Sequence, residues 1–405
     1  MSQDDETVIE VATGIAEVDA ADWDACANPD ATTANPFVSH AFLKALEDAE
    51  TVSARTGWQP RHLILRAGDG SVDGCMPLYA KSHSKGEYVF DYGWADAYER
   101  AGGSYYPKLL AAVPFSPVPG PRLLARPGPD ADARRKLLAA GGIELTRQLG
   151  LSSFHVNFAT ESEWHTLADL GFLKRTDQQF HWRNRDHITF DDFLADLASR
   201  KRKVIRRERR EATESGLQIN WLTGRDITEA HWDAMYTFYM ETGSRKWGRP
   251  YLNRTFFSLL GETLADRCLL IMVTRNGREI AGALNLIGGD CLFGRYWGAI
   301  EHHPFLHFEV CYYQAIEYAI AHGLERVEAG AQGEHKLARG YMPTSTYSAH
   351  WLPDPRFRRA VAAYLEDERA YVARAQEALA AYAPYRKGAR ATCSADTNPT
   401  ESDND

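Results

Sequence analysis

One hairpin pattern occurs twice in the chain, as Leu269-Leu-Ile-Met-Val-Thr-Arg-Asn-Gly-Arg-Glu-Ile-Ala-Gly-Ala-Leu-Asn-Leu286 and as His62-Leu-Ile-Leu-Arg-Ala-Gly-Asp-Gly-Ser-Val-Asp-Gly-Cys-Met-Pro-Leu-Tyr79. Both stretches begin and end with apolar runs that are typical of strands. Between the runs stand Asn276-Gly277 and Asp69-Gly70, residues that tolerate the positive φ of a tight hairpin turn. The pattern predicts two copies of one structural unit.

Two further features recur in the same order. Each hairpin is followed by an amphipathic helix, a Gly-Leu helix end and a short strand, seen most clearly in residues 308–329. A glycine with an aromatic and an apolar residue then precedes a His-Trp pair, at Gly171 before His181 and at Gly340 before His350, with the same spacing (181 − 171 and 350 − 340). Three matches in one order predict a tandem repeat of an α/β unit.

The repeat divides the chain into four parts. We expect a first unit over 1–184, a basic helical connector over 185–216, a second unit with a C-terminal helix over 217–387, and a disordered tail over 388–405. In the connector, Thr189-Phe-Asp-Asp192 fits a capping box, and the sequence predicts a single helix from there to Ser215-Gly216.

Composition and charge narrow the class of protein. The 405 residues are 44% hydrophobic, which suits a globular core, and no apolar run reaches the length of a membrane helix. With an acidic start and no CxxC pair, the chain is expected to be cytoplasmic and reduced. The net charge of -9 disfavours nonspecific nucleic-acid coating, although Arg200 to Arg210 contains eight basic residues among eleven.

The strong catalytic signatures are absent from the sequence. It contains no P-loop, Rossmann glycine fingerprint, HExxH or GxSxG motif, and no cysteine-histidine set with metal spacing. Nucleotide hydrolysis and zinc catalysis therefore have no support, and no metal site is predicted.

The best candidate site is Ala329-Gly-Ala-Gln-Gly-Glu-His-Lys-Leu-Ala-Arg-Gly-Tyr341. It leaves a buried strand, and its glycines let the backbone approach a ligand closely. A solvated polar turn is the alternative. We assign catalytic roles to Lys336, His335 and Glu334, and substrate binding to Arg339 and Gln332.

Three other segments carry chemistry-bearing groups. Glu87 and Asp91 lie among aromatic residues near the end of a predicted strand, where carboxylates can bind substrate or simply cap a loop. Arg245, Lys246 and Trp247 could hold an anionic substrate, or form a surface loop. In the basic run, Arg202, Arg206 and Arg207 are candidates for binding an anionic donor, with a solvated face as the alternative.

Four segments resemble a known family: Asn35-Pro-Phe-Val-Ser-His40, Lys81-Ser-His-Ser-Lys-Gly-Glu-Tyr-Val-Phe-Asp91, Tyr105-Tyr-Pro-Lys-Leu-Leu110 and Gly330-Ala-Gln-Gly-Glu-His-Lys-Leu-Ala-Arg-Gly340. They look like FemAB-like proteins of peptidoglycan biosynthesis or recognition, and the resemblance spans Asn35 to Lys387. It implies an α/β (α+β) fold of tandem GNAT-like acyltransferase domains, with mixed, mostly antiparallel sheets joined by the basic helical connector.

The resemblance also implies an activity. Fem-type enzymes transfer an amino acid from tRNA to an amine of a muramyl-peptide precursor, and a lysine beside the acceptor maps to Lys336. We therefore expect an acyltransferase that acts on a muramyl-peptide-like or other amine-bearing small substrate, with tRNA as a possible partner. No cofactor is assigned beyond aminoacyl-tRNA or acyl-CoA as co-substrate.

Two alternatives remain open. An acetyl-CoA-dependent GNAT N-acetyltransferase would need a glycine-rich turn for the pyrophosphate, yet Glu301-His-His-Pro-Phe-Leu-His307 contains no glycine and Arg100-Ala-Gly-Gly103 is a fragment of such a turn. A non-catalytic peptidoglycan- or RNA-binding protein could have kept the fold without the chemistry.

Overall fold

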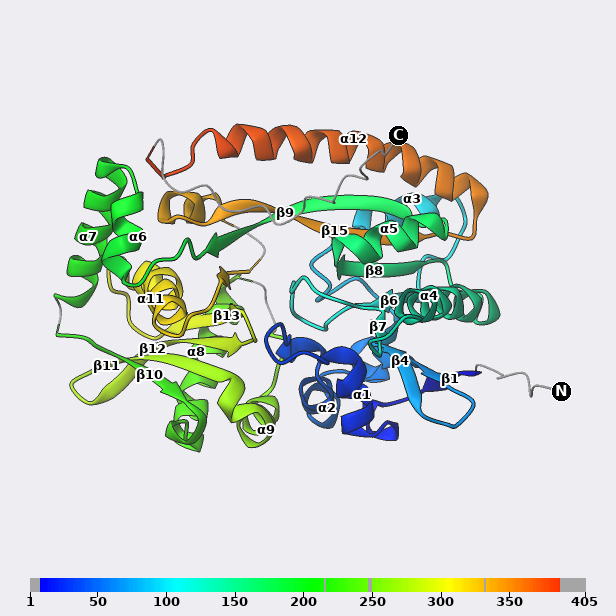
Figure 1. Ribbon diagram of the computed structural model, residues 1–405, viewed down its shortest axis with the longest axis horizontal. Coiled ribbons are helices and arrows are strands. Elements are labelled where there is room, and N and C mark those ends of the chain that lie inside the picture. The colour runs from blue at the N-terminus through cyan, green and yellow to red at the C-terminus, as the bar shows by residue number, and fades with distance from the viewer. Residues whose placement is uncertain (1–7, 215, 247–249, 331–332, 387–405) are drawn as a thin grey trace, which may run out of the picture.

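The computed structural model describes residues 8–214, 216–246, 250–330 and 333–386 (Figure 1). Over these residues, eleven strands form one sheet in the order β10-β11-β12-β13-β14-β9-β15-β8-β6-β5-β2, and four form a second sheet in the order β1-β3-β4-β7. The strand bounds are β1 Val8–Ala12, β2 Trp58–Pro60, β3 His62–Arg66, β4 Val72–Met76, β5 Leu78–Lys81, β6 Lys108–Ala111, β7 Leu124–Ala125, β8 Phe154–Ala159, β9 Leu173–Arg183, β10 Gln218–Thr223, β11 Cys268–Arg275, β12 Arg278–Ile287, β13 Cys291–Ala299, β14 Arg326–Glu328 and β15 Met342–Trp351.

The two halves of the chain exchange their last strands. β9 from the N-terminal half pairs with β14, β15 from the C-terminal half pairs with β8, and β9 and β15 pair with each other in antiparallel fashion. Asp177 lies opposite Thr346, and these two positions differ by the repeat offset at the glycine motif (346 − 177 = 340 − 171). The pairing is therefore symmetric about this point, as two copies of one unit require.

Both predicted hairpins are present. β3 and β4 pair in antiparallel fashion, as do β11 and β12. Asn276 has a φ of 52° and Gly277 a φ of 76°, the left-handed conformations that a two-residue hairpin turn uses. In the first hairpin, Pro77 separates β4 from β5, so that β4 joins the small sheet while β5 joins the large one.

Helices cover both faces of the large sheet, and α12 lies along β9 and β15 (Figure 1). The helix bounds are α1 Ala20–Ala27, α2 His40–Asp48, α3 Tyr92–Arg100, α4 Ala131–Gln148, α5 Glu161–Asp169, α6 Phe190–Asp196, α7 Ser199–Thr213, α8 Glu229–Lys246, α9 Arg254–Leu264, α10 Leu306–Phe308, α11 Gln314–Ala321 and α12 Pro355–Ala380. A π-helical turn, Glu309–Tyr313, joins α10 to α11. In the described part of the chain, none of the helices combines the length and apolar character of a membrane span.

The connector contains two helices where the sequence predicts one. The Thr189 capping box is present, since Asp192 N donates to Thr189 Oγ1 at 3.2 Å and Thr189 N donates to Asp192 Oδ2 at 2.8 Å. Leu197, however, is extended and pairs with Tyr385, and Ala198 N donates to Pro384 O at 2.9 Å. The chain that follows α12 therefore breaks the helix by offering the backbone other partners. The predicted unit boundaries at 184 and 216 stay a proposal.

Two buried histidines join the exchanged strand to its neighbour. His155 on β8 lies opposite His350 on β15, with 2.7 Å between their Nδ1 atoms. Burial lowers the pKa of His155 to about 3 and holds that of His350 well below its usual range. Both rings are consequently neutral in the folded protein at neutral pH.

This pair predicts a specific loss of stability in acid. Below pH 6.5 each of these histidines becomes protonated in the unfolded chain but stays neutral in the folded chain. Each histidine therefore lowers the free energy of unfolding by about 1.4 kcal/mol per pH unit as the pH falls toward its folded pKa. Urea unfolding between pH 7.5 and 5.5 measures this slope. We expect His155→Gln to flatten it and His302→Gln, at an exposed position, to leave it unchanged. Equal slopes in wild type and His155→Gln would contradict the prediction.

Candidate active site

The large sheet opens where β13 and β14 separate. The two strands pair in parallel only between Cys291–Phe293 and Arg326–Glu328. β13 then continues to Ala299, while the chain after Glu328 turns away at Gly330, whose φ is 77°. Positions 294–297 remain partly exposed although Phe293 and Gly298 on either side are buried. In the described part of the chain, this edge of β13 therefore has no pairing strand beyond Phe293, although the Arg295 side chain is only 3% exposed.

Lys336 reaches this opening from a short 3-10 helix, Glu334–Arg339, which is flanked by Gly333 and Gly340 in left-handed conformations. Its Nζ donates to Ala329 O at 2.6 Å and to Gly330 O at 2.9 Å. Burial, and to a smaller extent the charge of Arg295, lower the pKa of Lys336 to about 8. Because an ammonium has three protons, one remains for a substrate.

Arg295 and Glu328 form an incomplete ion pair beside Lys336. Arg295 is the extra residue of a β-bulge, since Leu284 pairs with Tyr296 and Asn285 with Gly294. Bulges redirect side chains and are common next to active sites. Arg295 Nη2 lies 3.7 Å from Glu328 Oε2, too far for a hydrogen bond, and each side chain is only 3% exposed.

The facing atoms of this pair are unsatisfied. Arg295 Nη1 donates to Gly294 O at 2.8 Å, whereas Arg295 Nε, Arg295 Nη2 and Glu328 Oε2 have no hydrogen-bond partner among the described residues. Burial lowers the pKa of Arg295. The other oxygen of this carboxylate, Glu328 Oε1, accepts from Arg326 Nε at 3.4 Å. Buried polar atoms without a hydrogen-bond partner cost free energy, so the unsatisfied atoms are consistent with a polar group that a substrate supplies.

The N-terminal half contributes the other side of the site. Gln179 Nε2 donates to Pro117 O at 2.7 Å, and Gln179 Oε1 lies 3.2 Å from His181 Nε2. His181 faces Glu328 across the β9–β14 pair, and burial lowers its pKa to about 4, so its ring is neutral. The Arg295 guanidinium lies 4.8 Å from the ring centre of Phe37. Both halves therefore shape the opening.

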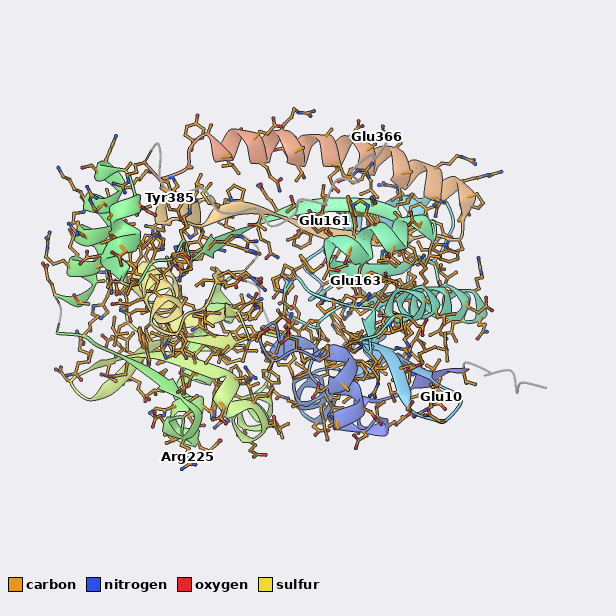
Figure 2. The ribbon with its side chains drawn as sticks, viewed as in Figure 1. Glu10, Glu161, Glu163, Arg225, Glu366 and Tyr385 are labelled. Carbon is orange, nitrogen blue, oxygen red and sulfur yellow. The ribbon has the colours of Figure 1, made fainter. Side chains whose placement is uncertain are left out.

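The other predicted residues of the loop lie near Lys336. His335 Nε2 lies 2.9 Å from Tyr312 Oη, and Arg339 Nη2 donates to both Glu208 oxygens at 3.0 Å. Tyr385 donates to Gly340 O at 2.7 Å and so ties the chain after α12 to this loop, as its position in Figure 2 shows. Gln332 and Trp247 lie outside the described residues, as do the side chains of Glu334, Arg245 and Lys246.

Glu87 and Asp91 lie in a separate cluster in the N-terminal half. They occupy the loop after β5 and the start of α3, not the end of a strand, because the chain leaves the sheet after Lys81. Both carboxylates are ion-paired with the buried Lys108, at 2.7 Å for Glu87 Oε2. Burial raises the pKa of Glu87 to about 7 and lowers that of Lys81 to about 7. Substrate binding by this pair stays a prediction.

The three arginines predicted to bind a donor all lie on α7. Arg206 pairs with Asp191 at 2.9 Å and Arg207 with Glu211 at 3.5 Å, while Arg202 has no ion pair among the described residues. The helix contacts the 3-10 helix that carries Lys336. The two segments that the sequence singled out separately are thus neighbours.

Sequence reasoning missed Arg295 and Glu328. The aromatic and glycine residues of Arg295-Tyr-Trp-Gly298 are typical of a sheet core, and Arg326-Val-Glu-Ala329 has the pattern of a short strand. A usable signal was present, because a charged residue within a strand that is buried on both faces needs a partner or a function.

A model of the FemAB-like family, described as peptidoglycan biosynthesis/recognition, matches residues 14–387. The chain belongs to this family. A search of curated proteins finds no match to this FemAB-like protein. Among solved structures, it is similar to FemX, with a TM-score of 0.54 and 12% identity over 85% of this chain and 98% of FemX.

A second similar structure is the C-terminal domain of a putative lysylphosphatidylglycerol synthetase from Agrobacterium fabrum. The TM-score is 0.53 and the identity 8%, over 86% of the FemAB-like chain and 96% of that domain. At such low identity these similarities show the fold alone. The protein has the predicted α/β fold of tandem GNAT-like units with mixed, mostly antiparallel sheets.

The Lys108 cluster gives a test of what Glu87 and Asp91 do. Replacing Lys108 with Met leaves two buried carboxylates without their main cation, which should destabilise the protein by about 3–5 kcal/mol in urea unfolding. Arg66→Met, which breaks the more exposed Arg66–Glu10 pair, should cost less than about 1 kcal/mol. An unchanged stability in Lys108→Met would show that the cluster does not hold the fold together.

Proposed function

We propose that this FemAB-like protein is an acyltransferase that moves an aminoacyl or other acyl group onto an amine of a peptidoglycan precursor. The observation that carries the proposal is the buried Lys336 beside the unsatisfied Arg295–Glu328 pair, at the opening between β13 and β14. Membership of a family of peptidoglycan biosynthesis/recognition supports the choice of acceptor.

Lys336, Arg295 and Glu328 can stabilise the charges and accept the proton that arise during acyl transfer. When an amine attacks an ester carbonyl, a C–N bond forms, the carbonyl oxygen becomes negative and the amine must lose a proton. Lys336 Nζ and the free guanidinium edge of Arg295 can donate to that oxygen. Glu328 Oε2 can accept the amine proton. Collapse of the intermediate then breaks the C–O bond, and the leaving alkoxide takes up a proton.

The helix that begins at Leu306 favours an aminoacyl ester such as aminoacyl-tRNA over acyl-CoA as donor. GNAT enzymes bind the pyrophosphate at a helix N-terminus, but here the buried Glu309 carboxylate lies near that end, paired with Arg209 at 2.9 Å. A second anion would be repelled there. In the N-terminal half, Arg100-Ala-Gly-Gly103 ends α3 and so does not open a helix.

Substitution of Lys336 tests the proposed donor to the oxyanion. With radiolabelled aminoacyl-tRNAs and muramyl-pentapeptide precursors as substrates, Lys336→Met should lower kcat by about 10²–10³-fold. Because only the ammonium form donates, wild-type activity should fall as the pH rises above about 8, and Lys336→Arg should move that fall to higher pH. Lys44→Met, at a surface ion pair, serves as the control.

The outcomes of this assay are distinct. Full activity in Lys336→Met would contradict the role of the lysine. No transfer to any muramyl precursor, with aminoacyl-tRNAs and acetyl-CoA tested side by side, would contradict the proposed function itself.

Substitution of Glu328 tests the proton acceptor. Glu328→Gln keeps the shape of the side chain and removes its basicity, so kcat should fall by about 10²–10⁴-fold while KM changes little. Urea unfolding of the same variant checks that the fold is intact. A rate equal to that of wild type would show that another group takes the proton.

A further inference from the structure

The basic run of the connector is compensated over only part of its length. In the later turns of α7, each arginine has a carboxylate partner among the described residues. The N–O distances are 2.9 Å for Arg206–Asp191, 3.5 Å for Arg207–Glu211, 2.9 Å for Arg209–Glu309 and 3.3 Å for Arg210–Glu214. Carboxylates of the protein itself therefore compensate these four arginine charges.

The first turn of α7 is different. Arg200, Lys201, Arg202 and Lys203 have no ion pair in the part of the chain that the structure describes, and they follow one another at the positive end of the helix dipole. Cations near a helix N-terminus are destabilising, as are neighbouring like charges. The N-cap residue, Ala198, has no side-chain acceptor to offset this. These four cations therefore have no compensating anionic group among the described residues.

Two hollows flank this turn, and both are lined by Arg200 and Val204. One, of about 350 Å³, also contacts Lys201, Tyr313, Arg339 and the carboxylate Glu208, which is paired with Arg339. The other, of about 530 Å³, contacts Lys203 and Arg207. Their sizes fall in the range of small-molecule sites. They are the places where a ligand could meet the uncompensated charges.

Arg339 provides an independent indication of a ligand. The residue is only 7% exposed, it lines the smaller hollow, and its Nε has no hydrogen-bond partner among the described residues. The two terminal nitrogens are occupied, by Glu208 and by His335 O. A buried guanidinium with one free donor is typical of a site that a ligand completes.

We propose that the first turn of α7, with Arg339, binds the phosphate groups of a phosphorylated ligand. A phosphate carries nearly two charges and accepts several hydrogen bonds, which suits successive cations at a helix N-terminus better than a carboxylate does. Val204 and Tyr313 offer an apolar surface to the remainder of the ligand.

The position of this site links it to the candidate active site. Arg339 Nη1 donates to the carbonyl of His335, the residue before Lys336. A ligand held here would therefore lie beside the lysine loop, and its role as a substrate rests on the proposed function. Its binding does not, since no chemical step is needed for the phosphate to bind.

Pyrophosphate is the probe, and calorimetric titration of the full chain at low salt is the measurement. We expect the Arg200→Gln/Lys203→Gln double variant to bind at least about tenfold more weakly than wild type. The matched control is Arg210→Gln/Arg225→Gln, which removes the same charge from exposed positions outside both hollows and should bind as wild type does.

Several results would overturn the proposal. Equal affinity in the two double variants would show that binding follows net charge, and no binding of pyrophosphate to wild type would remove the site. If a single-stranded RNA binds through Arg200 and Lys203 while pyrophosphate does not bind, the surface is a nucleic-acid-binding site and not the proposed phosphate site. Intact pyrophosphate binding without any acyl transfer would contradict the proposed function while leaving this inference in place.

Discussion

The antiparallel pairing of β9 with β15 is the constraint on which the rest of the structure depends. Each strand ends one half of the chain and completes the sheet of the other half. Without it the large sheet would fall into two pieces, and β9 and β15 would be edges with unpaired backbone groups. The exchange also places His181 beside Glu328 and His350 beside His155, so both buried polar clusters depend on it.

Charge burial distinguishes the two halves. In the N-terminal half, Lys108 Nζ donates directly to Glu87 Oε2 and Asp91 Oδ2, while Glu87 Oε1 and Asp91 Oδ1 have no hydrogen-bond partner among the described residues. In the C-terminal half, Arg295 and Glu328 face each other at a distance that allows no hydrogen bond, next to Lys336, whose pKa is lowered by burial. The N-terminal cluster therefore has direct hydrogen bonds between its cation and its carboxylates, whereas the C-terminal pair has none and lies where β13 and β14 separate.

Local sequence patterns predicted the two hairpins and the start of α6. Asn276-Gly277 and Asp69-Gly70 mark hairpins because their backbone preferences act over two residues, and the Thr189 capping box does the same for α6. Lys336 was predicted because it stands in a glycine-rich loop after a strand, and its catalytic role stays a prediction. The break at Leu197 was missed, because its cause is Tyr385, almost two hundred residues later in the chain.

The sequence by itself indicated a repeat of an α/β unit, the positions of the hairpin turns and the loop that carries Lys336, because turn geometry and repeat spacing depend on residues close together in the chain. Only the tertiary structure decided that the units exchange strands, that Arg295 and Glu328 form an ion pair without a hydrogen bond beside the buried Lys336, and that the basic run of α7 is half compensated. Those outcomes depend on which distant carboxylates and carbonyls reach each cation, and such pairings arise only when the sheet is assembled.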